Sequence, residues 1–229
     1  MFYISKGSVE IKPVNMKLRL LKFWVLILSY FILSIADFSL TYMGTPDLRF
    51  EGNPLVIAFG LGWPALTVKN IAALIIFVLL AYYYSVKYER KFVPCKNIKE
   101  FCSMLLYERP DKFYWIFYKS ANNRKAFWAL VAYAFIFPAL TLRIVAVSEW
   151  LLVLQRNSWQ SLNYWNFWLI YNSPSNSVIW NIYLDIKRIV PGGNIYNTVW
   201  ITIGILIIPI WFLKEYKFNN MYIQTKGSI

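Results

Sequence analysis

Residues 20–43 read LLKFWVLILSYFILSIADFSLTYM, and this apolar run decides the fold. A helix needs about 20 residues to cross a hydrocarbon core about 30 Å thick, so the run is long enough to span a bilayer. It follows a polar stretch and is too long for the apolar part of a signal peptide, which predicts a retained span. Further runs at residues 63–86, 126–154 and 196–214 predict three more spans.

The composition of the chain agrees with this class of protein. Hydrophobic residues make up 59% of the 229 residues, aromatic residues 20% and charged residues only 15%, a more apolar balance than a soluble domain carries. We therefore predict an all-α polytopic integral membrane protein in which residues 1–229 form a single membrane domain. The expected architecture is a four-helix transmembrane bundle with interfacial amphipathic segments.

Lysine and arginine are distributed unequally around the predicted spans. Of the 24 basic residues, 18 lie before or at the start of the first span, between the second and third, or at the end of the fourth and beyond it. Basic residues concentrate in cytoplasmic loops, so both termini are expected in the cytoplasm of a multi-pass protein of the cell membrane. The net charge of +13 follows from this topology, and we expect membrane lipids rather than nucleic acid as partners. A homo-oligomer or a larger membrane complex stays open.

Two long connections differ in character. Residues 87–125 mix basic with aromatic and aliphatic residues, which predicts a cytoplasmic basic loop with one or two interfacial amphipathic helices broken near Pro110. Residues 156–193 are rich in Trp and Tyr, which prefer the headgroup layer, so we expect an aromatic segment on the outer leaflet. This segment either covers a ligand or forms an ordinary aromatic belt. The polar turn at residues 172–176 argues against a fifth span there.

Histidine is absent, and Cys95 and Cys102 are the only cysteines. This excludes bis-His haem, His-bound copper or iron, thiolate-rich zinc sites and hydrolytic triads with a His base. We expect no cofactor and no metal site, and any catalysis must use Asp, Glu, Lys, Tyr or Ser. The two cysteines are seven residues apart and would share a face of one helix, and no disulfide is expected at that spacing in the cytoplasm.

Polar side chains form a stripe on the first predicted span. Tyr30, Ser34, Asp37 and Thr41 recur at spacings of four, three and four residues, so they share one face of a helix. Lipid tails cannot satisfy such groups, so the stripe must face protein or water. The helix rise places Asp37 about 22 Å beyond Lys22, in the outer third of the bilayer.

Other charged residues are predicted to reach the same outer layer. Lys69 lies inside the second span and Arg143 near the outer end of the third, while Asn-Pro at residues 53–54 predicts a helix start. Charges at membrane depth usually pair, so we expect an Asp37–Lys69 pair with Arg143 and Glu51 nearby. The candidate ligand-binding residues are Asp37, Thr41, Glu51, Asn53, Lys69, Arg143 and Glu149.

This pattern resembles a group of small bacterial and archaeal membrane proteins that is classed as a domain of unknown function. The resemblance covers about residues 30–85 and rests on Asp37 with Thr41, Glu51 with Asn53 and Pro54, and then Lys69. It implies a small helical bundle in which Asp37, Thr41, Glu51, Asn53 and Lys69 belong together. It implies no reaction, because that group is itself uncharacterised.

Three functions fit these observations. In the first, Lys69 and Arg143 hold an anionic lipid or small anionic ligand at the outer leaflet, for binding or translocation. In the second, an outer-leaflet transferase or hydrolase uses Asp37 or Glu51 as general base. In the third, the protein is a structural or accessory subunit whose charges fix helix packing. We favour the first, because no nucleophile and base spacing is visible; whether the protein is an enzyme stays open.

Overall fold

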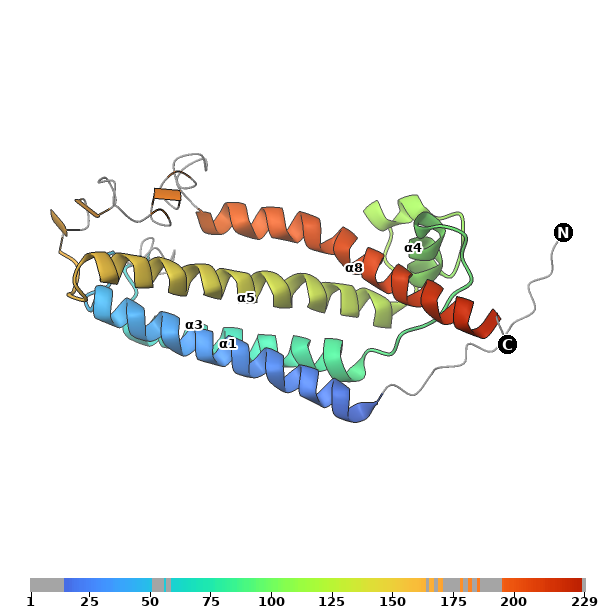
Figure 1. Ribbon diagram of the computed structural model, residues 1–229, viewed down its shortest axis with the longest axis horizontal. Helices are drawn as coiled ribbons and strands as arrows, with labels where there is room; N and C mark the ends of the chain where they lie inside the picture. The colour runs from blue at the N-terminus through green and yellow to red at the C-terminus, as the bar shows by residue number, and fades with distance from the viewer. Residues whose placement is uncertain are drawn as a thin grey trace. The chain divides into compact units, whose positions relative to one another are not determined.

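Long helices dominate the structure (Figure 1). The computed structural model describes residues 15–50, 56, 59–163, 165–166, 169–170, 178, 181–182, 185 and 195–227. Within these residues the chain is helical and contains no strand. The long helices are α1 (Met16–Gly44), α3 (Trp63–Tyr82), α5 (Arg124–Arg156) and α8 (Ile195–Gly227), and the short ones are the π-helical turn η1 (Tyr83–Lys87), α4 (Ile98–Tyr107) and the 3-10 helix η2 (Phe113–Phe117).

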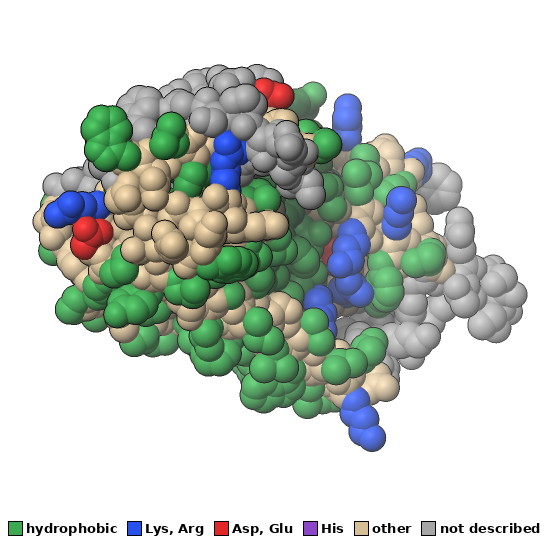
Figure 2. All heavy atoms as spheres, turned by 60° about the vertical axis from the view of Figure 1, so that its left-hand side comes forward, with side chains coloured by type: hydrophobic (Ala, Val, Ile, Leu, Met, Phe, Trp, Pro, Cys, Tyr) green, Lys and Arg blue, Asp and Glu red, His purple; other side chains and the backbone are tan. Residues whose placement is uncertain are grey.

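Three of the described helices are long and apolar enough to cross a membrane. They are α1 with 29 residues, α3 continued by η1 with 25 residues, and α5 with 33 residues. In their apolar parts only 17% to 22% of the residues are buried inside the protein. Hydrophobic side chains accordingly cover much of the described surface in Figure 2. Exposed apolar faces of this size are the pattern of a multi-pass membrane protein, and the first three predicted spans are confirmed as apolar helices.

The chain divides into two compact units. The first unit comprises Met1–Trp24, Leu80–Ile136 and Gly204–Ile229, and the second comprises Val25–Leu79 and Phe137–Ile203. Each long helix contributes residues to both units. The predicted fourth span, at residues 196–214, lies within α8, which continues as one helix to Gly227.

Close packing between helices holds the second unit together. The Tyr30 ring of α1 stacks on the Phe77 ring of α3, with centroids 4.1 Å apart and planes 11° apart. Gly44, the last residue of α1, lies directly against the Trp150 ring of α5, and a Cβ atom at this position would overlap the ring. The Trp63 indole also donates to the Pro46 carbonyl at 2.7 Å. Aromatic stacking and the close approach at Gly44 thus hold the three apolar helices together.

The connection between α3 and α5 folds into a compact part of the first unit. Asn97 caps α4 by accepting a hydrogen bond from the Glu100 amide at 2.9 Å, and the helix is followed by Glu108 in a left-handed conformation, with a φ of 59°. The chain then turns at Pro110 before η2, so the predicted break is confirmed. The apolar face of α4 is buried within the protein, and Phe101 packs 5.7 Å from the Tyr216 ring of α8. An interfacial position for this segment stays a prediction.

The two cysteines are free thiols that do not share a helix. Cys102 lies in α4, whereas Cys95 precedes that helix, so the predicted shared helical face is wrong. The Asn219 amide of α8 approaches the Cys95 sulfur at 3.4 Å. Burial raises the pKa of the Cys102 thiol to about 12, which keeps it protonated at neutral pH.

Candidate functional site

The predicted polar stripe of α1 faces the interior of the second unit. Tyr30 and Thr41 are buried, and the side chain of Asp37 is only 16% exposed. The Thr41 hydroxyl donates to the Asp37 backbone carbonyl at 2.8 Å. The Ser34 hydroxyl is buried and has no hydrogen-bond partner among the described residues. The sequence required this stripe to face protein or water, because lipid tails offer these groups no partner, and in the structure it faces protein.

Three apolar helices meet at an ion pair inside this unit. The Arg143 guanidinium of α5 donates one hydrogen bond to the Asp37 carboxylate of α1, with which it forms a salt bridge, and another to Asn70 Oδ1 of α3 at 2.6 Å. The guanidinium also lies 5.6 Å from the centre of the Tyr30 ring. Both charged side chains are about one-sixth exposed, at 15% and 16%. We call Asp37, Asn70 and Arg143 the three-helix cluster.

Two other predicted site residues lie within electrostatic range of Asp37. Lys69 precedes Asn70 on α3 and is exposed, and Glu149 is half-buried on α5. Glu51 and Asn53 lie outside the described residues, as does most of the predicted outer aromatic loop. The sequence argument paired Asp37 with Lys69 and expected Arg143 nearby, whereas in the structure Arg143 forms the salt bridge with Asp37. The structure also adds Asn70, which sequence reasoning missed. An uncharged residue beside Lys69 carries no signal that would single it out in a sequence.

The geometry of the three-helix cluster suits a brace between helices. Arg143 has acceptors on two different helices, and a charged hydrogen bond in a partly buried place holds its groups firmly. A guanidinium that is already engaged by a carboxylate and an amide oxygen has less to offer an anionic ligand.

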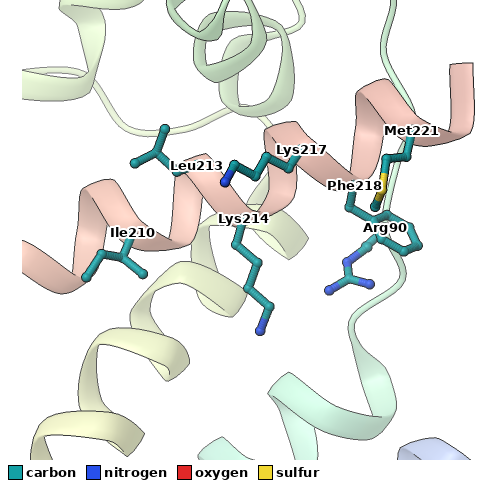
Figure 3. A pocket seen from close by; sticks show the side chains of 7 residues that line it. All are labelled: Arg90, Ile210, Leu213, Lys214, Lys217, Phe218 and Met221. Carbon is teal, nitrogen blue, oxygen red and sulfur yellow. The ribbon is translucent and has the colours of Figure 1, made fainter. Parts of the chain in front are cut away.

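A second site lies in the first unit, on α8 and on the segment after η1, at residues 88–95, which has no regular secondary structure. An open groove of about 460 Å³ is bordered by seven side chains (Figure 3), namely Arg90, Ile210, Leu213, Lys214, Lys217, Phe218 and Met221. The six residues from α8 recur at spacings of three or four, so they form one stripe along that helix. The lining combines three cations with four apolar side chains and contains no acidic residue. We call it the basic pocket.

The Nε side of the Arg90 guanidinium is bound within the protein, whereas its Nη groups are not. Its Nε atom donates to both carboxylate oxygens of Glu215, at 2.8 and 3.1 Å, and its guanidinium lies 4.2 Å from the centre of the Phe218 ring. The Glu215 side chain is 4% exposed and that of Arg90 is 28% exposed. The two Nη groups of Arg90 have no hydrogen-bond acceptor among the described residues. Figure 3 shows the Arg90 guanidinium and Lys214 on the same side of α8.

The position of Arg90 depends on a clamp between the extended chain and α8. Asn219 accepts a hydrogen bond from the Val93 amide at 2.9 Å and donates one to the Val93 carbonyl at 3.0 Å. The Arg19 side chain of α1 donates to the Tyr88 carbonyl. These hydrogen bonds fix the backbone at Tyr88 and Val93, on both sides of Arg90. The position of the Arg90 Cα atom is therefore set before any ligand binds.

Positive charge exceeds negative charge around Glu215. Lys22 lies within electrostatic range of Arg19, Arg90 and Lys214, with Glu215 as the nearby acid, and its Nζ atom is 3.6 Å from the centre of the Tyr84 ring. Three polar groups in the same unit are buried without a hydrogen-bond partner among the described residues: the hydroxyls of Ser85 and Tyr88 and the indole N–H of Trp211. Burial raises the pKa of Tyr88, so its phenol stays a protonated donor.

Sequence reasoning missed the basic pocket because it assigned the basic residues to topology alone. The available signal was Glu215, an acid enclosed by Lys214, Tyr216 and Lys217 at the end of an apolar run. An isolated acid in such a place often pairs with a distant cation, but the sequence does not say which one. Comparisons of the chain with protein-family models, with curated proteins and with solved structures find no match.

Proposed function

We propose that this protein is a four-span membrane protein that binds an anionic lipid in its basic pocket. The observation that carries the proposal is the lining of the pocket, in which Arg90, Lys214 and Lys217 stand beside four apolar side chains without an acid. An anionic head with an attached acyl chain satisfies both parts of this lining. The volume of about 460 Å³ suits a headgroup and the first part of one chain.

The topology supports the same ligand. In the proposed arrangement α8 is the fourth span, both termini are cytoplasmic, and the pocket lies at the inner end of α8. Ile210 and Leu213 belong to the apolar part of the helix, and Lys214 and Lys217 follow immediately. From residue 210 to residue 217 a helix rises about 10 Å, which is enough to pass from acyl chains to headgroups. The inner leaflet is also where anionic lipids attract basic side chains.

The three-helix cluster has a supporting role in this proposal. Arg143 is bonded to Asp37 and Asn70, which favours a brace over the outer-leaflet binding site expected from the sequence. The Asp37 carboxylate is likewise committed to Arg143, so the geometry gives little support to an outer-leaflet enzyme that uses it as general base. The basic pocket is the better anion site, because its lining contains no acid and the Nη groups of Arg90 have no acceptor among the described residues.

Native mass spectrometry of the purified protein in micelles tests the proposal. Phosphatidylglycerol and phosphatidylcholine with the same acyl chains are added in turn, and the bound fraction is measured for each. We expect phosphatidylglycerol to bind in preference, and the double variant Lys214→Gln/Lys217→Gln to lower its affinity about tenfold or more. The matched control is Lys91→Gln/Lys119→Gln, which removes the same charge from exposed lysines outside the pocket.

Two outcomes contradict the proposal. Equal binding of the two lipids means that the pocket does not select charge. An equal loss in the pocket variant and in the control means that the net charge of the protein, rather than the pocket, attracts the lipid. Both variants must melt near the wild-type temperature, which is expected because the substituted lysines are exposed or lie on the rim.

A further inference from the structure

We infer that the anionic group bound in the basic pocket is a phosphomonoester, which Arg90 holds end-on while Glu215 sets the direction of the Arg90 side chain. This inference rests on the proposed function and names the chemistry of its ligand. It makes Arg90 the contact to the ligand and Glu215 a positioning residue, because Glu215 does not line the pocket.

The direction of Arg90 is the first step of the argument. Glu215 takes the Nε hydrogen through both of its carboxylate oxygens, so the guanidinium cannot turn that edge toward the pocket. The Phe218 ring covers one face of the same group at 4.2 Å. What is left is the edge with Nη1 and Nη2, a planar fork whose spacing matches two oxygens of a phosphate.

The cost of the arrangement is the second step. Glu215 is a carboxylate with 4% of its side chain exposed, and a buried ion pair often stabilises a fold no better than apolar residues of the same size. A buried carboxylate in this place therefore calls for another role, and directing the Arg90 side chain is one that its acceptor oxygens perform. The clamp of Asn219 on Val93 serves the same end by fixing the backbone near Arg90.

The number of charges is the third step. The lining presents three cations, Arg90, Lys214 and Lys217, and Glu215 behind Arg90 balances one of them, which leaves a net charge of about +2 at the pocket. A phosphodiester carries one negative charge, whereas a phosphomonoester carries about −1.5 to −2 near neutral pH because its second pKa is about 6. It also exposes three oxygens, so one pair can accept from Arg90 while the third faces a lysine. A dianion therefore matches the pocket better than a diester or a fatty acid does.

The same chemistry has two possible sources, a lipid headgroup and a soluble phosphate ester. The apolar side chains of Ile210, Leu213, Phe218 and Met221 favour a lipid, since a soluble ester would leave them uncovered. The experiment has an arm for each source.

The test is an equilibrium titration of the purified protein in micelles with dioctanoyl phosphatidic acid, dioctanoyl phosphatidylglycerol and glycerol phosphate. At a pH of about 7.5 we expect phosphatidic acid to bind about tenfold more tightly than phosphatidylglycerol. At a pH of about 5.5 the phosphomonoester loses its second charge, so this preference is expected to shrink severalfold while phosphatidylglycerol binding stays constant. Glycerol phosphate that binds as tightly as phosphatidic acid supports the phosphomonoester and identifies the soluble source.

Three variants separate orientation from charge. Glu215→Gln keeps an oxygen that accepts from Arg90 Nε and is expected to retain the preference, whereas Glu215→Ala loses it because Arg90 is no longer directed. Arg90→Lys keeps the charge without the fork and is expected to lose the preference as well. If Glu215→Ala does not fold, the comparison of Arg90→Lys with Glu215→Gln decides. A role of charge alone predicts that both Glu215 variants bind phosphatidic acid more tightly and that Arg90→Lys changes nothing.

The outcomes distinguish this inference from the proposed function. Equal affinity for phosphatidic acid and phosphatidylglycerol, without dependence on pH, overturns the phosphomonoester and leaves anionic-lipid binding in place. No saturable binding of either lipid overturns both.

Discussion

Replacing Arg143 with methionine removes the cation whose hydrogen bonds join α5 to α1 and α3 in the three-helix cluster. The variant loses a hydrogen bond to the Asp37 carboxylate and one to Asn70, and it leaves a carboxylate with only 16% of its side chain exposed. Removing one partner of a buried pair costs about 3–5 kcal/mol in soluble proteins. Polar contacts between membrane helices average about 0.6 kcal/mol and reach about 1.7 kcal/mol.

Both ranges bear on the expected cost. Two hydrogen bonds at the upper membrane value give about 3 kcal/mol, and the residual exposure of the pair argues against a larger figure. We therefore expect Arg143→Met to lower the free energy of unfolding by about 3 kcal/mol. Asp37→Asn keeps an acceptor oxygen and is expected to cost about 1 kcal/mol.

The assay is reversible unfolding in mixed micelles of a mild detergent and sodium dodecyl sulfate, followed by the fluorescence of the 11 tryptophans. The matched control is Lys69→Met, which removes an exposed cation of α3 next to the cluster and is expected to cost less than about 1 kcal/mol. The double variant Asp37→Leu/Arg143→Met removes both charges and is expected to recover most of the loss. A cost below about 0.5 kcal/mol for Arg143→Met refutes the brace, and so does a double variant whose loss equals the sum of the losses of Asp37→Leu and Arg143→Met measured singly.

Two further predictions concern packing and thiol chemistry. Gly44→Ala places a methyl group against the Trp150 ring, so we expect a loss of about 1–3 kcal/mol in the same unfolding assay, partly recovered by Trp150→Leu, and no recovery would exclude the ring as the cause. Burial raises the pKa of Cys102 from 9.0 to about 12, so the unfolded chain releases this proton first and the folded state is disfavoured as the pH rises above about 9. Between a pH of about 9 and 10 the wild type should lose about 1 kcal/mol more stability than Cys102→Ala, and parallel curves would contradict the shift.

The predictions made from the sequence differ in how well they match the structure, and the difference has a physical cause. Apolar runs identify the helices of the first three spans, because the cost of placing a segment in lipid is a sum over its own residues. The stripe that contains Asp37 faces protein as expected, because helical periodicity fixes a face. Periodicity does not say which neighbour meets that face, and so Asn70 was missed.

The segment between α3 and α5 illustrates the same limit. Its two short helices and the break at Pro110 follow from local rules of capping and proline geometry. Amphipathy alone shows that one face of α4 must be covered, but lipid and protein cover an apolar face equally well, and the structure places Phe101 against Tyr216. Cys95 lies outside α4 because Asn97 starts the helix two residues later.

The sequence by itself determined that this is a helical chain with several apolar segments, because solvation and helix propensity act on neighbouring residues. Only the tertiary structure decided that Arg90 pairs with Glu215, 125 residues away, and that Arg143 pairs with Asp37, 106 residues away. Burial makes such pairs selective, since a charge that leaves water must find its partner wherever packing brings one within reach. In α8 packing buries Trp211, Glu215 and Asn219 and leaves the stripe with Lys214 and Lys217 exposed, and this choice creates the pocket.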